Sequence, residues 1–165
     1  MLRDKFGAPA LHRASGNGHL KVVELLIDNG ADIDAQDVLG ATALHQSAAI
    51  HEPVLRLLLS KGANPSIATS MGETPLHSAV NANNLETVRA LLDAGSSVSA
   101  QDNDQATALF RSVNREFYKI ALELINRGAD VNARSANALQ EAISKAQIDL
   151  VKVMIEKGAA VNAQG

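Results

Sequence analysis

The chain has 165 residues, of which 46% are hydrophobic, and its acidic and basic residues are interspersed with a formal net charge of −3. It has no cysteine, which excludes disulfides, thiolate zinc sites and cysteine nucleophiles within this sequence. It has no dense run of Lys and Arg and no apolar run of about 20 residues, so we expect neither nucleic-acid binding nor membrane insertion.

One pattern recurs five times along the chain. A leucine is followed 18 or 19 residues later by a glycine, and the glycine by Ala or Ser. The leucines are Leu11, Leu44, Leu76, Leu109 and Leu139, and the glycines are Gly30, Gly62, Gly95, Gly128 and Gly158. A period near 33 residues indicates a stack of small units, none of which buries its apolar face alone. We expect one domain with units at 3–35, 36–67, 68–100, 101–133 and 134–165.

The first two units differ in the turn between their predicted helices. The first has Gly18 and His19 at this turn. The second has one residue fewer there, in the segment 49–52. Pro53 is expected in the first turn of the second helix, where its missing N–H is tolerated.

The third unit has the clearest helical pattern. It opens with Thr-Pro-Leu-His at 74–77, and proline suits the first turn of a helix. Leu76, Ala79 and Val80 form one apolar face at helical spacing. Asn83 is expected to break this helix, because Asn tolerates left-handed backbone. A second apolar stripe over 85–92 ends at Gly95, so each unit reads as helix, turn, helix and hairpin.

The last two units depart from this pattern. The fourth has Gln105 at the position of the hairpin glycine and Phe110 at the position of His77. Its turn between helices is Glu116-Phe117 in place of Gly-His. The fifth lacks three residues before its first helix, which predicts a short hairpin at 134–137.

Taken together, these motifs resemble the ankyrin repeat over nearly the whole chain. The matching segments are Gly-Glu-Thr-Pro-Leu-His at 72–77, Gly-His at 18–19 and Gly-Ala-Asp-Val-Asn-Ala at 128–133, with close variants at 30–35 and 158–163. The resemblance implies an all-α solenoid of stacked helix-turn-helix units with β-hairpin or loop connections.

Residues that suggest chemistry have structural interpretations. His12, His45 and His77 occupy equivalent positions and suggest a metal site, but the resemblance implies that each braces a hairpin through hydrogen bonds. The segment 102–104 lacks the Gly and Glu of a calcium loop, so its aspartates are expected to form turns. No phosphate-binding loop or nucleophile elbow is present. We therefore expect no enzyme activity, no cofactor and no metal.

The resemblance also implies a concave face, made of hairpin tips and the exposed side of the first helices, that binds a protein. The residues expected on it are Lys5, Phe6, Arg13, Val38, Leu39, Gln46, Met71, Glu73, Ser78, Asn81, Asp104, Arg111, Asn114 and Arg115. Three large apolar residues, Phe6, Leu39 and Met71, share one tip position. They form either a docking stripe or a contact that steadies the hairpins. Arg111, Asn114 and Arg115 would add a basic end.

The predicted function is that of a protein–protein interaction scaffold or adaptor. We expect the protein to be intracellular and cytoplasmic, because the absence of cysteine fits that location. An alternative is the targeting part of a larger enzyme, signalling protein or effector whose catalytic part lies outside these residues. A third possible function is that of a purely structural spacer. We expect a monomer, although the last helix around 150–155 has no polar lid and leaves self-association open.

Overall fold

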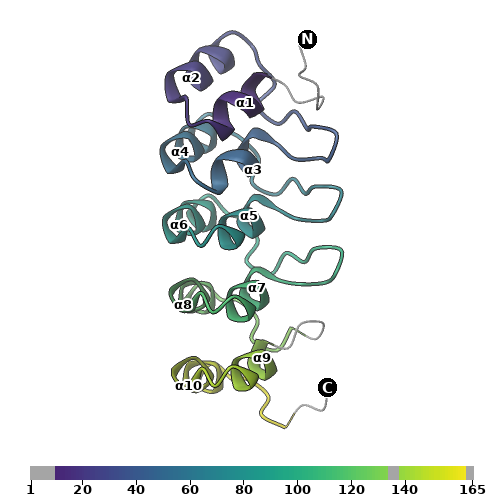
Figure 1. Cartoon of the computed structure of the whole chain (residues 1–165), viewed down its shortest axis with the longest axis vertical. Coiled ribbons are helices and arrows are strands. Elements are labelled where there is room, and N and C mark those ends of the chain that lie inside the picture. Colours follow the sequence, from purple (N-terminus) through teal and green to yellow (C-terminus); the bar gives the residue numbers. More distant parts are fainter. Residues whose placement is uncertain (1–9, 134–137, 163–165) are drawn as a thin grey trace.

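The structure, a computed structural model, describes residues 10–133 and 138–162, and this part forms five stacked helix pairs (Figure 1). One pair lies in each predicted unit. The first helices are α1 (Ala10–Gly16), α3 (Ala43–Ala48), α5 (Pro75–Asn81), α7 (Ala108–Asn114) and α9 (Ala138–Ser144). The second helices are α2 (Leu20–Asp28), α4 (Glu52–Ser60), α6 (Leu85–Asp93), α8 (Tyr118–Asn126) and α10 (Ile148–Glu156).

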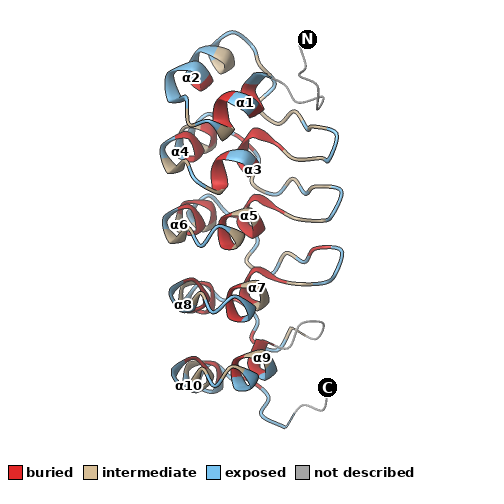
Figure 2. Ribbon diagram, in the orientation of Figure 1, coloured by how far each residue is buried: buried red, intermediate tan, exposed pale blue. Residues whose placement is uncertain are grey.

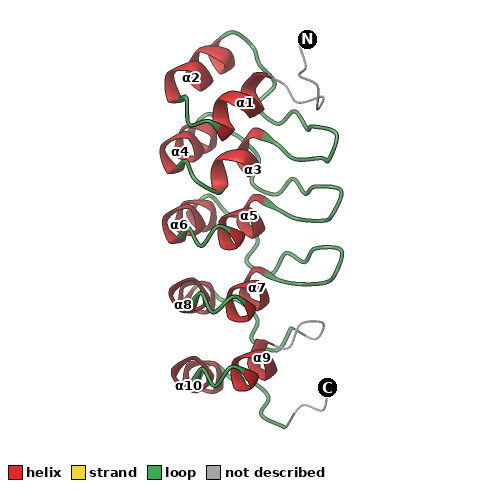
Figure 3. Cartoon of the chain, viewed as in Figure 1, coloured by secondary structure: helices red, strands yellow, loops and turns green. Residues whose placement is uncertain are grey.

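The helices form two layers, with first helices in one column and second helices in the other. The connections between pairs extend from the side of the first helices as long loops (Figure 3). Within the described residues they hold only one isolated bridge, between Gln101 and Thr107. Neighbouring tips are nevertheless joined by backbone hydrogen bonds, from Ser70 N to Leu39 O at 2.8 Å and from Asn103 N to Met71 O at 3.0 Å.

The core lies between the two layers and runs along the whole stack (Figure 2). The apolar face predicted for the third unit is confirmed, because Leu76, Ala79 and Val80 are all fully buried. The equivalent leucines Leu44 and Leu109 are buried as well. Each pair contributes a thin apolar layer that is covered by the next pair, which is how units of this size reach stability. No helix among the described residues has both the length and the apolar character needed to cross a bilayer.

The predicted helix ends are also confirmed. Pro75 and Pro53 lie in the first turns of α5 and α4. Asn83, which follows α5, has a φ of 56°, and Gly95, which follows α6, has a φ of 86°. Gln105, at the hairpin-glycine position of the fourth unit, keeps the left-handed backbone with a φ of 61°. The stack therefore imposes the turn even where the sequence lacks glycine.

The second unit accommodates its missing residue at the end of its first helix. α3 has six residues, whereas α1, α5, α7 and α9 have seven. His51, the N-cap residue that precedes α4, bonds through Nε2 to the Gly16 carbonyl at 3.1 Å and so contacts the first unit. The predicted short hairpin at 134–137 lies outside the described residues.

Candidate partner-binding face

The equivalent histidines hold the tips in place. The backbone N–H of Thr74 donates to Nδ1 of His77 at 3.1 Å, so the ring hydrogen lies on Nε2, which donates to the Ala106 carbonyl at 3.2 Å. His45 bonds in the same way to the Glu73 carbonyl at 3.0 Å, and His12 contacts the Ala41 carbonyl at 2.8 Å. Each histidine thus ties its helix to the following loop, as the structural interpretation predicts. Within the described ranges no three His, Asp or Glu side chains gather as a metal site.

His45 and His77 are neutral at physiological pH. Burial lowers the pKa of His45, and the hydrogen bond to the Glu73 carbonyl opposes this only in part. Burial also lowers the pKa of His77, and the positive charge of Arg111 lowers it further. A neutral ring is required here, because Nδ1 accepts a backbone hydrogen bond and cannot carry a proton of its own.

Three apolar side chains at neighbouring tips extend into solvent. Val38 is 70% exposed, Leu39 65% and Met71 60%. We call these three residues the tip row. Most of the surface of each side chain is therefore in contact with water. Phe6, which was expected at the same tip position as Leu39 and Met71, lies outside the described residues, as does Lys5, which was expected beside it.

Hydrogen bonds to a side chain of the same loop fix the backbone of these tips. The carboxylate of Asp37 accepts hydrogen bonds from the N–H groups of Leu39 and Ala41 at 2.8 and 2.9 Å. The hydroxyl of Thr69 accepts from the N–H groups of Met71 and Glu73, both at 3.2 Å. The tip row is therefore presented on a preorganised backbone, which lowers the entropic cost of binding.

The tips also approach one another closely. Gly72 has a φ of 75°, and a Cβ added there would lie 2.8 Å from the backbone nitrogen of Asn103 in the next tip. Glycine is needed at this position both for the left-handed backbone and for the contact.

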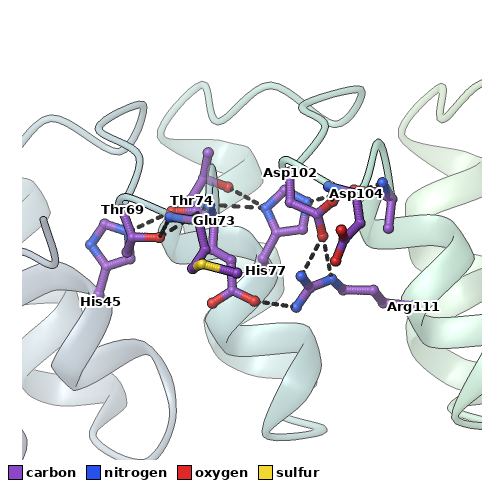
Figure 4. Close-up of polar contacts among 10 residues, drawn as sticks. His45, Thr69, Glu73, Thr74, His77, Asp102, Asp104 and Arg111 are labelled. Atoms are coloured by element: carbon purple, nitrogen blue, oxygen red, sulfur yellow. Dashed lines mark hydrogen bonds and ion pairs between the residues drawn. The ribbon is translucent and has the colours of Figure 1, made fainter. Parts of the chain in front are cut away.

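A buried ion-pair cluster joins the third and fourth units (Figure 4). Arg111, on α7, donates from Nε to Oδ2 of Asp102 at 3.1 Å and also contacts this oxygen through Nη2. Its Nη1 lies 2.6 Å from Oε1 of Glu73, which belongs to the preceding loop. All three guanidinium nitrogens therefore face carboxylates, and the two units are held together across their interface.

The cluster is charged at neutral pH. Burial alone would raise the pKa of Asp102, but the hydrogen bond and charge of Arg111, with backbone N–H donors from Ala106 and Asp104, outweigh it and lower this pKa. Burial acts to lower the pKa of Arg111, but its bonds to Asp102 and Glu73 outweigh burial and raise it.

This cluster corrects the prediction of a basic end. Arg111 is not available as a free cation, because two carboxylates neutralise it. Asp102 forms the predicted turn through hydrogen bonds from the N–H groups of Asp104 and Ala106, but it is also buried, with 7% of its surface exposed. An aspartate at a loop start followed nine residues later by an arginine was the available signal.

The remaining first-helix positions differ in exposure. Ser78, Asn81 and Arg111 are only half-buried. The exposed residues are Arg13, Asn17, Gln46, Ile50, Asn114 and Arg115. The structure thus places a mainly polar row beside the loops.

A polar cavity of about 370 Å³ lies on this face between the third and fourth units. We call it the α5–α7 pocket. Its polar lining comprises Asn81 of α5, Asp102 and Asp104 of the loop, and Arg111, Asn114 and Arg115 at α7, and Phe110 supplies an aromatic group. The amide oxygen Oδ1 of Asn81 is buried and has no hydrogen-bond partner in the described part of the chain. A polar group left in this state is a candidate for contact with a ligand.

Comparison with known proteins agrees with this architecture. A family model described as "Ankyrin repeats (3 copies)" matches residues 1–69, 51–135 and 95–165. The chain is 33% identical over 157 residues to "Ankyrin repeat and KH domain-containing protein mask-1" of Caenorhabditis elegans, covering 93% of this chain and 6% of that protein. It is 28% identical over 161 residues to "B-cell lymphoma 3 protein homolog" of Mus musculus, covering 96% of this chain and 29% of that protein. The matches of the family model together span the whole sequence. The chain therefore belongs to the ankyrin repeat family.

Proposed function

We propose that this chain is a non-catalytic scaffold that binds a protein partner on the face formed by its loop tips and first helices. Ankyrin repeats are in general protein–protein interaction modules. The observation that carries the proposal is the tip row, because Val38, Leu39 and Met71 are each at least 60% exposed on a braced backbone. Exposed apolar groups surrounded by polar residues often mark protein interaction sites.

The polar first-helix residues suit the role of setting specificity. Gln46, Asn114 and Arg115 are exposed beside the loops and can form hydrogen bonds with a partner. An apolar anchor with a polar surround is the usual anatomy of an interface, in which a few buried contacts carry most of the binding energy.

Affinity capture with a matched pair of variants tests the proposal. One bait carries Val38→Ser, Leu39→Ser and Met71→Ser. The control bait carries three apolar-to-serine changes on second helices, at Val22, Leu25 and Ile155, which are 46%, 63% and 47% exposed. Circular dichroism and a thermal melt first establish that both are folded.

The expected result is a protein retained by the unmodified chain and by the control bait, and lost from the tip-row bait. Loss from the control bait with retention by the tip-row bait would place binding on the second-helix layer and would contradict the proposal. Equal retention by all three baits would also contradict it.

A second candidate function is a targeting module within a larger protein. The chain spans less than a third of the length of both curated relatives, at 6% and 29%. In this case the same face would select a substrate or assembly partner for another domain. Sequencing the transcript on both sides of these residues distinguishes a module from a separate scaffold.

We further propose that the protein acts inside the cell, in the cytoplasm. The absence of cysteine from all 165 residues supports this, because small extracellular domains often depend on disulfides. Imaging of the full-length protein with a small tag tests the compartment, and a secreted or surface-exposed product would contradict it.

A further inference from the structure

We propose that the α5–α7 pocket receives a long basic side chain, arginine or lysine, from the bound partner. This inference rests on the proposed function and specifies the chemistry of one contact on the same face. It follows from which polar groups in the pocket are already bonded, from the charge balance around it and from its aromatic lining.

The pocket contains two side-chain oxygen acceptors that have no recorded partner among the described residues. Each of the three guanidinium nitrogens of Arg111 already contacts a carboxylate of Asp102 or Glu73. The buried Oδ1 of Asn81 has no partner among the described residues. Asp104 is exposed, and its recorded contact within the described chain is through its backbone N–H, which donates to Asp102 at 2.8 Å. A carboxylate and an amide oxygen in one cavity match a side chain with several N–H donors.

The charges around the pocket also favour a cation. Among the lining residues the charges of Asp102 and Asp104 balance those of Arg111 and Arg115. Glu73, which pairs with Arg111 from outside the lining, brings the balance to −1. Arg115 is the group that opposes a cation. It is exposed at the C-cap of α7, where water and salt screen its charge.

The aromatic ring of Phe110 gives the pocket a second feature suited to such a ligand. Phe110 stands at the position held by His77 in the preceding unit and is half-buried in the pocket lining. Arginine and lysine have apolar stems that pack on hydrophobic groups, and their charged ends are attracted to aromatic rings. A cavity of about 370 Å³ accommodates a side chain of this length.

NMR titration with two small probes tests the inference without any partner. The ¹⁵N-labelled chain is titrated with Nα-acetyl-L-arginine methylamide and, separately, with Nα-acetyl-L-glutamate methylamide. The expected result is a saturable shift of the Asn81 side-chain amide and the Asp104 backbone amide with the arginine probe alone. No shift with the arginine probe, or equal shifts with both probes, would overturn the proposal.

Charge variants sharpen this test. Asp104→Asn is expected to weaken binding of the arginine probe about threefold to fivefold, the range of a solvent-exposed ion pair. Asp104→Lys should abolish it, and Glu156→Gln, an exposed site on α10, should leave it unchanged. Unchanged affinity in Asp104→Lys would overturn the proposal. Affinity capture tests whether the face as a whole binds a protein, whereas the NMR titration tests only the pocket. Failure of the pocket proposal is therefore distinguishable from failure of the proposed function.

Discussion

Removal of the Arg111 side chain from the ion-pair cluster should destabilise the stack far more than removal of its outer partner. In Arg111→Gln the carboxylate of Asp102, whose side chain is 3% exposed, keeps its backbone N–H donors but loses its counter-charge. Breaking a buried pair costs about 3–5 kcal/mol. Because the Arg111 side chain is itself 18% exposed, we expect a loss at or just below the lower end of this range, about 2–3 kcal/mol.

Glu73→Gln is the matched comparison. The Glu73 side chain is 31% exposed, so its loss should cost less than about 1 kcal/mol. Urea unfolding followed by circular dichroism measures both free energies. The double variant Arg111→Gln with Asp102→Asn should recover part of the loss, because no unpaired buried charge remains.

The pH dependence of this loss provides an internal check. The depressed pKa of Asp102 means that its stabilisation is complete above the unfolded-state value of about 3.9 and disappears as pH falls through the lower folded-state value. The difference between Arg111→Gln and the unmodified chain should therefore shrink in strong acid. Equal losses for Arg111→Gln and Glu73→Gln at pH 7 would refute the account of the cluster.

Three further predictions concern the frame of the stack. Because the pKa values of His45 and His77 are lowered, their contribution to stability is present above about pH 6.5 and is lost as pH falls below it, and urea titrations that show no such decline would contradict this. Ala146 has a φ of 51°, so Ala146→Gly should raise the melting temperature by about 2–4 °C, whereas a decrease would show that the turn is unstrained. Gly72→Ala should destabilise more than Gly95→Ala in the same assay, because both have positive φ but only at Gly72 does a Cβ meet the backbone of the neighbouring tip; equal losses would count against tight stacking of the tips.

Features decided within one unit could be predicted from the sequence. The buried face of α5 depends on Leu76, Ala79 and Val80, whose spacing reports burial directly. Pro75 and Asn83 likewise mark the start and end of this helix through their own backbone preferences. These properties are local, so they do not require knowledge of how the units stack.

Features that depend on contacts between units could not be predicted in the same way. The neutralisation of Arg111 requires Glu73 of the preceding loop, and the burial of Asp102 requires the loops to stack closely. Gln105 keeps a left-handed backbone despite its side chain, because hydrogen bonds from its neighbours fix the turn. The ion pairs of Arg111 therefore emerged only with the structure, and they remove this residue from the expected basic end.

Site-specific photo-crosslinking tests the central claim most directly. A benzophenone amino acid replaces Leu39 or Met71 in the tip row, or Leu25 on α2, which has a similar exposure of 63%. After irradiation in cells of the source organism, the account predicts a covalent adduct with a common protein from positions 39 and 71 and none with that protein from position 25. A protein that is crosslinked from position 25 but from neither position 39 nor position 71 would contradict a partner-binding role for the tips.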